Sequence, residues 1–326
     1  MHPLPANPAP KTFRRRAKQL YLRTRSWLRR EKLLIPELTG QPASDLIGST
    51  LLAGQPCLVC RFGRVELDAV LRWVDSQAPG STWQKWLRYL TARSGPFRWD
   101  DAFRRMMHNN AGFFPVDDAN LARFAGRMWD DMPAIDILGC WLPGETRLQP
   151  HFRQARLVGL ADLEPYYHAN PWSSALQGKR VLVVHPYADT ICSQYARREQ
   201  LFSDPRVLPE FELLTLPAVQ SIAGNTGGFA SWFDALAWME AQVQALDFDI
   251  AIVGAGAYGL PLAASIKRMG KQAVHLGGAV QILFGIRGRR WDQMPAVNRF
   301  YNPAWVRPSA SEIPANHQAV ERGCYW

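Results

Sequence analysis

Three glycines spaced for close contact with a phosphate follow a short apolar run. The run, residues 248–253, has the length and β-branched content of a buried strand. Gly254, Gly256 and Gly259 come directly after it, and their lack of a Cβ lets a ligand approach the turn closely. A helix expected over residues 260–269 would offer its N-terminal N–H groups to an anion at the same place. We therefore predict that this turn binds the phosphate groups of a nucleotide.

The spacing G-x-G-x-x-G also occurs in proteins that bind dinucleotides. Those proteins carry an acidic residue about 20 positions further on, where it holds the ribose hydroxyls. Here the second expected strand, residues 272–276, contains His275 and is followed by Gly277 and Gly278, so the carboxylate is missing. The pattern therefore favours the diphosphate of a nucleotide sugar over NAD(P). A further alternative is that the glycines only allow a helix to pack tightly on a strand.

A cation and a carboxylate flank a glycine at the end of the first expected strand, residues 57–62. Arg61 lies at the strand end, Gly63 follows it, and Glu66 lies in the first turn of the next helix. An arginine at this place can bind phosphate, and the carboxylate can act as a general base. The alternative is that Glu66 only interacts with the helix dipole.

Two histidines lie at the ends of expected strands. His185 ends the strand over residues 180–185, and His275 lies near the end of the strand over 272–276. Because ligands of open parallel sheets bind outside the carboxyl ends of the strands, both side chains can face one cleft. The alternative for both is a packed, hydrogen-bonded histidine with no chemical role.

The strands that carry these residues alternate with helices. We expect strands over the ranges 57–62, 135–139, 180–185, 211–216, 248–253 and 272–276. This alternation indicates an α/β, Rossmann-like fold with a mostly parallel sheet and helices on both faces. The expected organisation is a basic segment with a linker (1–38), an α/β domain (39–302) and a C-terminal tail (303–326) that wraps the surface.

One segment is expected to be a linker, and two others are expected to be helices with aromatic side chains in the core. Pro36 to Pro42 has the composition of a linker. Residues 83–93 and 99–109 are expected to be helical. We predict that their aromatic side chains belong to the core rather than to a ligand platform: Trp83, Trp86, Tyr89 and Phe103.

The composition is that of a soluble enzyme, with 47% apolar and 20% charged residues among 326. There is no run of about 18 apolar residues and no apolar core of a secretory signal, so we expect a cytoplasmic protein. Five scattered cysteines favour reduced thiols. Cys57 and Cys60 form a C-x-x-C, but a strand would point them to opposite faces, which argues against zinc or redox chemistry.

Most of the net charge of +10 lies in residues 11–32, which carry ten basic residues against one glutamate. A basic helix with aromatics such as Trp27 can lie on an anionic membrane surface, at about 1 kcal/mol per basic residue. This interpretation places the protein at the inner face of the membrane. The alternative is a solvated leader. We expect no nucleic-acid partner, because the rest of the chain lacks a recognisable binding module.

The first strand end and the glycine turn carry patterns that occur together in one family. Residues 61–66 read R-F-G-R-V-E, and residues 253–257 and 270–278 read V-G-A-G-A and G-K-Q-A-V-H-L-G-G. The chain thus resembles bacterial glycosyltransferases of the GT-D fold, whose motifs are R-F-G-D-G-E, L-G-P-T-A and G-x-x-A-x-D-x-G-H. The resemblance implies a Rossmann-like domain that transfers sugar from a nucleoside diphosphate sugar, in the assembly of a surface polysaccharide or glycoconjugate.

Several residues depart from the family's motifs. Arg64 stands at the first acid of the family's D-x-E pair, and Val65 stands at a glycine. The resemblance makes Glu66 the remaining acid, as the base for the acceptor hydroxyl or as a ligand of Mn²⁺ or Mg²⁺, and such a metal would lose one ligand. We hypothesise that Arg64 supplies the lost positive charge. His275 replaces an aspartate, and Gly278 replaces a histidine.

Sequence and resemblance together predict a glycosyltransferase whose acceptor is a glycan or is linked to a lipid. The predicted catalytic residues are Glu66 and His185. The predicted donor-binding residues are Arg61, Gly63, Arg64, Gly254, Gly256, Tyr258, Gly259, His275, Gly277, Gly278 and Gln281. The alternatives are an NAD(P)-dependent oxidoreductase and a non-catalytic nucleotide-binding or assembly module of the same fold.

Overall fold

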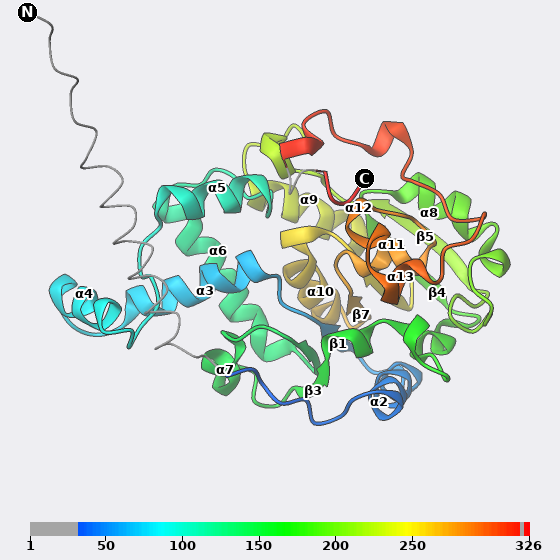
Figure 1. Cartoon of the computed structure of the whole chain (residues 1–326), viewed down its shortest axis with the longest axis horizontal. Helices are drawn as coiled ribbons and strands as arrows, with labels where there is room; N and C mark the ends of the chain where they lie inside the picture. Colours follow the sequence, from blue (N-terminus) through cyan, green and yellow to red (C-terminus); the bar gives the residue numbers. More distant parts are fainter. Residues whose placement is uncertain (1–31, 320–322) are drawn as a thin grey trace, which may run out of the picture.

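One parallel β-sheet with helices on both faces forms the centre of the molecule (Figure 1). The computed structural model describes residues 32–319 and 323–326, so the predicted basic helix within 11–32 lies outside it apart from Lys32. The strands are β1 (Cys57–Cys60), β2 (Ile137–Cys140), β3 (Arg156–Gly159), β4 (Arg180–His185), β5 (Glu212–Pro217), β6 (Ile250–Val253) and β7 (Gln272–His275). All neighbouring strands are parallel, which confirms the predicted α/β, Rossmann-like fold.

The strand order β3-β2-β1-β7-β6-β4-β5 fixes where a ligand can enter. From β1 the chain continues to β2 on one side, while β7 pairs with β1 on the other. From β4 it continues to β5 on one side, while β6 pairs on the other. Connections that leave in opposite directions open a crevice at the carboxyl ends of such strands.

The helices begin at recognisable caps. Asp100 and Asp117 each accept an N–H from the first turn of the helix that follows, at 2.9 Å. The α-helices of the described residues are α2 (Gln41–Leu52), α3 (Arg64–Gln77), α4 (Thr82–Leu90), α5 (Asp101–Asn109), α6 (Asp118–Asp131), α7 (Glu145–Leu148), α8 (Ala188–Tyr195), α9 (Trp232–Gln244), α10 (Gly259–Arg268), α11 (Ala279–Leu283), α12 (Arg289–Asp292) and α13 (Pro295–Asn298). None of these helices has both the length and the apolar character needed to cross a bilayer.

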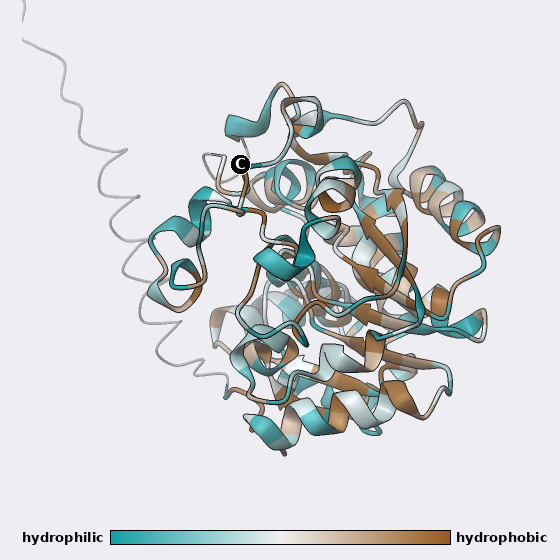
Figure 2. Ribbon diagram, turned by 90° about the vertical axis from the view of Figure 1, so that its right-hand side faces the viewer, coloured by the Kyte–Doolittle hydropathy of each residue, from teal (hydrophilic) through white to brown (hydrophobic). Residues whose placement is uncertain are grey.

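The sheet separates two hydrophobic cores. One core packs α3, α5, α6, α9 and α10 on one face, and the other packs α2, α8 and α11 on the opposite face. Hydrophobic strands lie between these helix layers (Figure 2). Cys60 belongs to the first core and Cys57 to the second, so the prediction that they point to opposite faces is confirmed.

The segment Pro36 to Pro42 is docked on the sheet, and its prediction as a linker is wrong. Leu38 forms a parallel bridge with Val158 of β3, and α2 begins already at Gln41. A Cβ on Gly48 of α2 would come within 3.6 Å of the Trp172 backbone. Gly48 therefore lies against the Trp172 segment at a distance that would also accept a methyl group.

The aromatic residues of α4 do not all lie in the core. Phe103 of α5 is fully buried, as predicted, but Trp83 is 70% exposed and Trp86 is 37% exposed. The prediction for these two tryptophans is wrong, because helical periodicity does not show whether a neighbour covers the apolar face.

The C-terminal tail does not only wrap the surface. Trp305 and Trp326 are 3% and 7% exposed. The Arg290 N–H donates to the Cys324 carbonyl at 2.8 Å and ties the end of the tail to α12. As a result, residues 325 and 326 reach the crevice described next.

Candidate functional site

Two adjoining cavities, of about 120 and 250 Å³, open at the carboxyl ends of the strands. Gly256 and Ala257, which follow β6, line both cavities. Gly277 and Gly278, which follow β7, also line both. The two cavities are therefore compartments of one crevice, at the place where the strand order predicts it.

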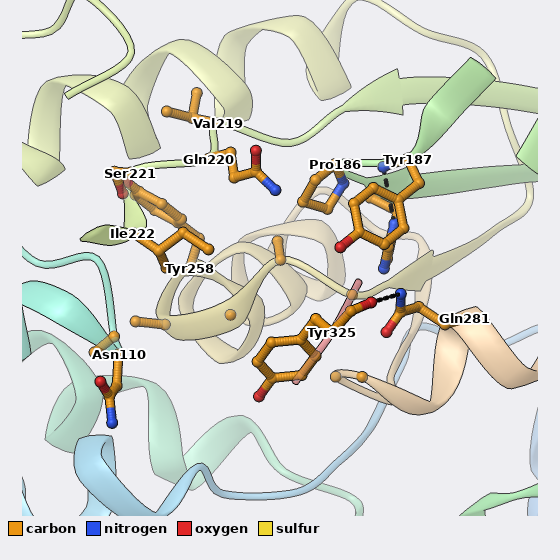
Figure 3. A pocket seen from close by; sticks show the side chains of 18 of the residues that line it. Asn110, Pro186, Tyr187, Val219, Gln220, Ser221, Ile222, Tyr258, Gln281 and Tyr325 are labelled. Atoms are coloured by element: carbon orange, nitrogen blue, oxygen red, sulfur yellow. Dashed lines mark hydrogen bonds between the residues drawn. The ribbon is translucent and has the colours of Figure 1, made fainter. Parts of the chain in front are cut away.

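The smaller compartment, here termed the aromatic cavity, lies beyond β4, β5 and β6 (Figure 3). Tyr187 and Gln281 lie on one side of it, and Ser221 and Ile222 lie on the other. Tyr325 also lines it, and its carbonyl accepts a hydrogen bond from the Gln281 amide at 3.1 Å. Rings and a few polar groups make this compartment suitable for a flat, polar ring system.

The larger compartment, here termed the arginine cavity, concentrates positive charge. Arg61, Arg64 and Arg290 line it, and Glu66 is the acidic residue in its lining. Trp141 lies beside them: the Arg61 and Arg64 guanidinium carbons are 4.7 and 5.2 Å from the centre of its ring. Three guanidinium groups and one carboxyl group favour an anionic ligand.

Arg61 is the half-buried cation of this compartment. Its Nε and Nη2 donate to the Phe62 carbonyl, both at 3.2 Å. Burial lowers the pKa of Arg61, and attraction to Glu66 opposes this effect. In the part of the chain that the structure describes, no carboxylate forms an ion pair with Arg61. The guanidinium is therefore available to a ligand anion.

Glu66 folds back over the start of its own helix. A Cβ on Gly63 would lie 2.0 Å from the Glu66 Oε2, so the carboxyl group occupies the space that this glycine leaves open. Burial raises the pKa of Glu66, while its own helical N–H and the charge of Arg61 lower it. The carboxyl group thus interacts with the helix terminus, as in the alternative interpretation, and also lines the arginine cavity.

The two strand-end histidines lie in different compartments and are both buried. His185 lines the aromatic cavity, and its Nδ1 accepts the Tyr187 N–H at 3.0 Å, so the neutral ring carries its proton on Nε2. His275 lines the arginine cavity and lies 3.2 Å from the Val253 carbonyl through Nδ1. Burial lowers the pKa of His185 to about 3 and that of His275 to about 4. Both rings are neutral at neutral pH.

The glycines of the turn have different roles. Gly256 has φ +54° and no atom near its missing side chain, so it presents bare backbone to both compartments. A Cβ on Gly254 would come within 2.6 Å of the His185 ring. Gly259 lines neither compartment, because it packs against His275. Its position supports the packing alternative rather than a contact with the ligand.

Tyr258 lines the aromatic cavity, and its hydroxyl is paired with another residue of the lining. Its hydroxyl is 2.7 Å from the Ser221 hydroxyl, and its ring stacks on Trp232 with centroids 4.8 Å apart. Burial raises the pKa of Tyr258 well above its ordinary value. This residue therefore forms a wall of the crevice.

Other crevice residues were missing from the sequence-based prediction. Trp141 and Ser221 follow β2 and β5 by one and four residues, and the strand-end rule would have found both. Asn110 follows α5, whereas Arg290 and Tyr325 come from the C-terminal part of the chain. Nothing in the local sequence of these three residues indicates the crevice.

The residues around Glu66 do not form a complete protein site for a divalent metal. Among the described residues, no group of three His, Cys, Asp or Glu side chains could hold a metal ion. Arg64 takes the place of one acid that the resemblance implies, and Arg61 acts electrostatically on the remaining acid. The positive charge of this compartment therefore comes from arginine side chains.

Comparison with known proteins assigns the chain to no family. Neither a family model nor a curated protein nor a solved structure matches it. The chemistry of the crevice is therefore the main guide to function.

Proposed function

We propose that the protein is a glycosyltransferase that moves a sugar from a nucleoside diphosphate sugar to a glycan or lipid-linked acceptor. The arginine cavity carries this proposal: three guanidinium groups lie beside a glycine turn at the carboxyl edge of the sheet. A diphosphate is a compact, multiply charged anion, and an arginine can bind its oxygens through several N–H groups.

The donor spans both compartments in this proposal. The diphosphate lies over Gly256 and Gly277. Their φ angles of +54° and +60° favour glycine, and because glycine has no Cβ, the phosphate groups can approach the backbone. The nucleoside lies in the aromatic cavity, where Tyr187 and Gln281 offer a ring and an amide. His185 contacts the nucleoside through its Nε2–H and takes up no proton, because its Nδ1 already accepts the Tyr187 N–H and burial lowers its pKa to about 3.

Glu66 receives the proton of the acceptor. The acceptor hydroxyl attacks the anomeric carbon, and the bond from this carbon to the diphosphate oxygen breaks. The hydroxyl proton passes to Glu66, whose raised pKa suits a general base. The nucleoside diphosphate leaves with the bonding electrons, and Arg61, Arg64 and Arg290 stabilise its charge.

Thermal unfolding with added nucleotides tests the proposal. The ligands are UDP, GDP, CMP, nucleotide sugars and NAD(P)H, each with and without Mn²⁺. We expect a nucleoside diphosphate to raise the Tm without Mn²⁺, and Arg61→Ala to remove this effect. Arg153→Ala is the control, because Arg153 is exposed and lines neither compartment. The proposal fails if no nucleoside diphosphate stabilises the protein, or if Arg61→Ala responds like the wild type.

The same screen separates the two alternatives. Stabilisation by NAD(P)H alone would favour an oxidoreductase. Stabilisation by a nucleotide, without hydrolysis or transfer of any nucleotide sugar, would favour a binding or assembly module. Within the described residues, β7 ends at His275 and no acidic side chain lines either compartment at that strand end, so the structure offers no support for NAD(P).

A further inference from the structure

Helix α4 forms without burying any of its residues. A reciprocal cap holds its start: the Ser81 hydroxyl accepts the Gln84 N–H at 3.3 Å, and the Gln84 side chain accepts the Ser81 N–H at 2.8 Å. The helix lies at the end of the molecule furthest from the sheet (Figure 1, cyan). A helix of nine residues is marginal on its own, so a partner on its apolar face would stabilise it.

The apolar face of α4 carries large exposed side chains, and the two most exposed are Trp83 and Leu87. Trp83 and Leu87 are four positions apart, hence on one face, and they are 70% and 50% exposed. Trp86 lies at the edge of this face and anchors the helix to the body through Phe97, with ring centroids 5.2 Å apart. The helix is thus held from one side and presents the other to solvent. Adjacent exposed apolar side chains of this size mark an interaction surface.

The chain around this face is basic. Residues 76–99 contain Lys85, Arg88, Arg93 and Arg98 and no acidic residue. Arg93 and Arg98 are exposed. Within residues 32–319 and 323–326, none of these four side chains forms an ion pair. The face is therefore an apolar surface within a positively charged region.

The charge decides which partner fits. A second copy of this face and residues 11–32 of the same chain are both strongly basic, so each would be repelled. A bilayer with anionic lipids meets both requirements, because it is negatively charged and accepts Trp and Leu side chains. Tryptophan and leucine sit at the boundary of headgroups and acyl chains, while lysine and arginine reach the headgroups.

We propose that α4 docks the protein on an anionic membrane surface through Trp83 and Leu87. This interaction is separate from any contact made by residues 11–32, and it does not depend on the proposed sugar transfer. The exposure of both side chains means that replacing them leaves the cores intact.

Vesicle flotation of the full chain tests this docking. The vesicles contain phosphatidylcholine alone or with phosphatidylglycerol. We expect the wild type to float with the anionic vesicles, and Trp83→Ser/Leu87→Ser to reduce its partition coefficient about tenfold or more. The matched control is Leu52→Ser/Trp238→Ser, which removes the same residue types at 68% and 39% exposed positions elsewhere, and should float like the wild type.

Charge variants and two further assays complete the test. Arg93→Gln/Arg98→Gln should also weaken flotation on anionic vesicles, and more so at low salt. Equal flotation of Trp83→Ser/Leu87→Ser and the wild type would overturn the proposal. Normal flotation of this variant with a loss of self-association in size-exclusion chromatography would show that the face binds a second copy. Normal flotation with a loss of binding to an oligonucleotide would show that it binds nucleic acid. Either result would overturn the proposal. Circular dichroism must show the same fold in all variants.

Discussion

At the level of single residues, the tightest contact of the glycine turn is between Gly259 and His275. A Cβ on Gly259 would lie 2.0 Å from the His275 Cε1, and both residues are buried among strands and helices. We predict that Gly259→Ala lowers the free energy of unfolding by about 1–3 kcal/mol, because the ring has to move within a packed core. Urea unfolding measures this loss.

Gly126 of α6 provides the control for this substitution. No atom lies near its missing side chain, and alanine is a better helix former than glycine. Gly126→Ala should therefore stabilise the protein by about 0.5–1 kcal/mol. If both variants changed stability in the same direction, the packing role of Gly259 would be wrong.

The buried ring of His275 also makes stability depend on pH. Burial lowers the pKa of His275 to about 4, and the nearby charge of Arg61 adds to this effect. In the unfolded chain a histidine takes up its proton below about pH 6.5. Between these values the unfolded state binds more protons, so stability falls as the pH falls. The pKa difference of about 2.5 units between the unfolded and folded states corresponds to a loss of about 3 kcal/mol in the free energy of unfolding.

Comparison with His275→Gln isolates this effect from other titrating groups. As the pH is lowered from about 6.5 to about 4, we expect the wild type to lose up to about 3 kcal/mol relative to the variant. Urea unfolding of both proteins at several pH values gives this difference. A difference that stays constant over the window would mean that the pKa of His275 is the same in the folded and the unfolded protein.

At the level of elements, one side chain of β7 fastens α2 to the sheet. The Gln272 Nε2 donates to the carbonyls of Leu51 and Gln55 at 3.0 and 3.1 Å, at the end of α2. Gln272 is buried, so without these hydrogen bonds its amide would lie in the core with no partner. We predict that Gln272→Met, which keeps the shape but removes the donor, costs about 1–3 kcal/mol.

The same substitution at an exposed position is the control. Gln77 ends α3 and donates only to the neighbouring Ser76 hydroxyl among the described residues. Gln77→Met should therefore change the free energy of unfolding by less than about 0.5 kcal/mol. Equal effects at both positions would mean that the amide of Gln272 does not hold α2.

The elements predicted from the sequence are those with a strong local pattern. Apolar runs located β1, β2 and β4 to β7, whereas β3 is a four-residue edge strand that begins with Arg156. Helix α2 was missed because Pro42, Gly48 and two serines give it the composition of a loop. Its stability comes from the packing of Ala43, Ile47 and Leu51 in the core, which a local pattern does not show.

The site was predictable to the extent that its residues adjoin strands. Arg61 follows β1, His185 ends β4, and Gly256 lies three residues after β6, so the carboxyl-edge rule placed them in one crevice. Arg290 and Tyr325 reach the same crevice through chain far from any strand. Their contribution depends on how the C-terminal part of the chain crosses the sheet, and no local pattern encodes that path.

At the level of the whole molecule, both cores combine the two halves of the chain. On one face Phe62 belongs to the same core as Val253, and on the other Ile47 belongs to the same core as Ile252. The sheet is also continuous, because β1 of the first half pairs with β7 of the second. Neither half buries its apolar surface alone, and this predicts mutual dependence in folding.

We therefore predict a single cooperative unfolding transition, although chains of this size often unfold through intermediates. The tryptophans are distributed over both halves, so their fluorescence reports on the whole sheet. Unfolding curves from fluorescence and from far-ultraviolet circular dichroism should have the same midpoint in urea. Trp83→Ser/Leu87→Ser should leave this midpoint unchanged, because the exposed face of α4 belongs to neither core. Two separate transitions would instead show that one half keeps a stable core when β1 and β7 have come apart.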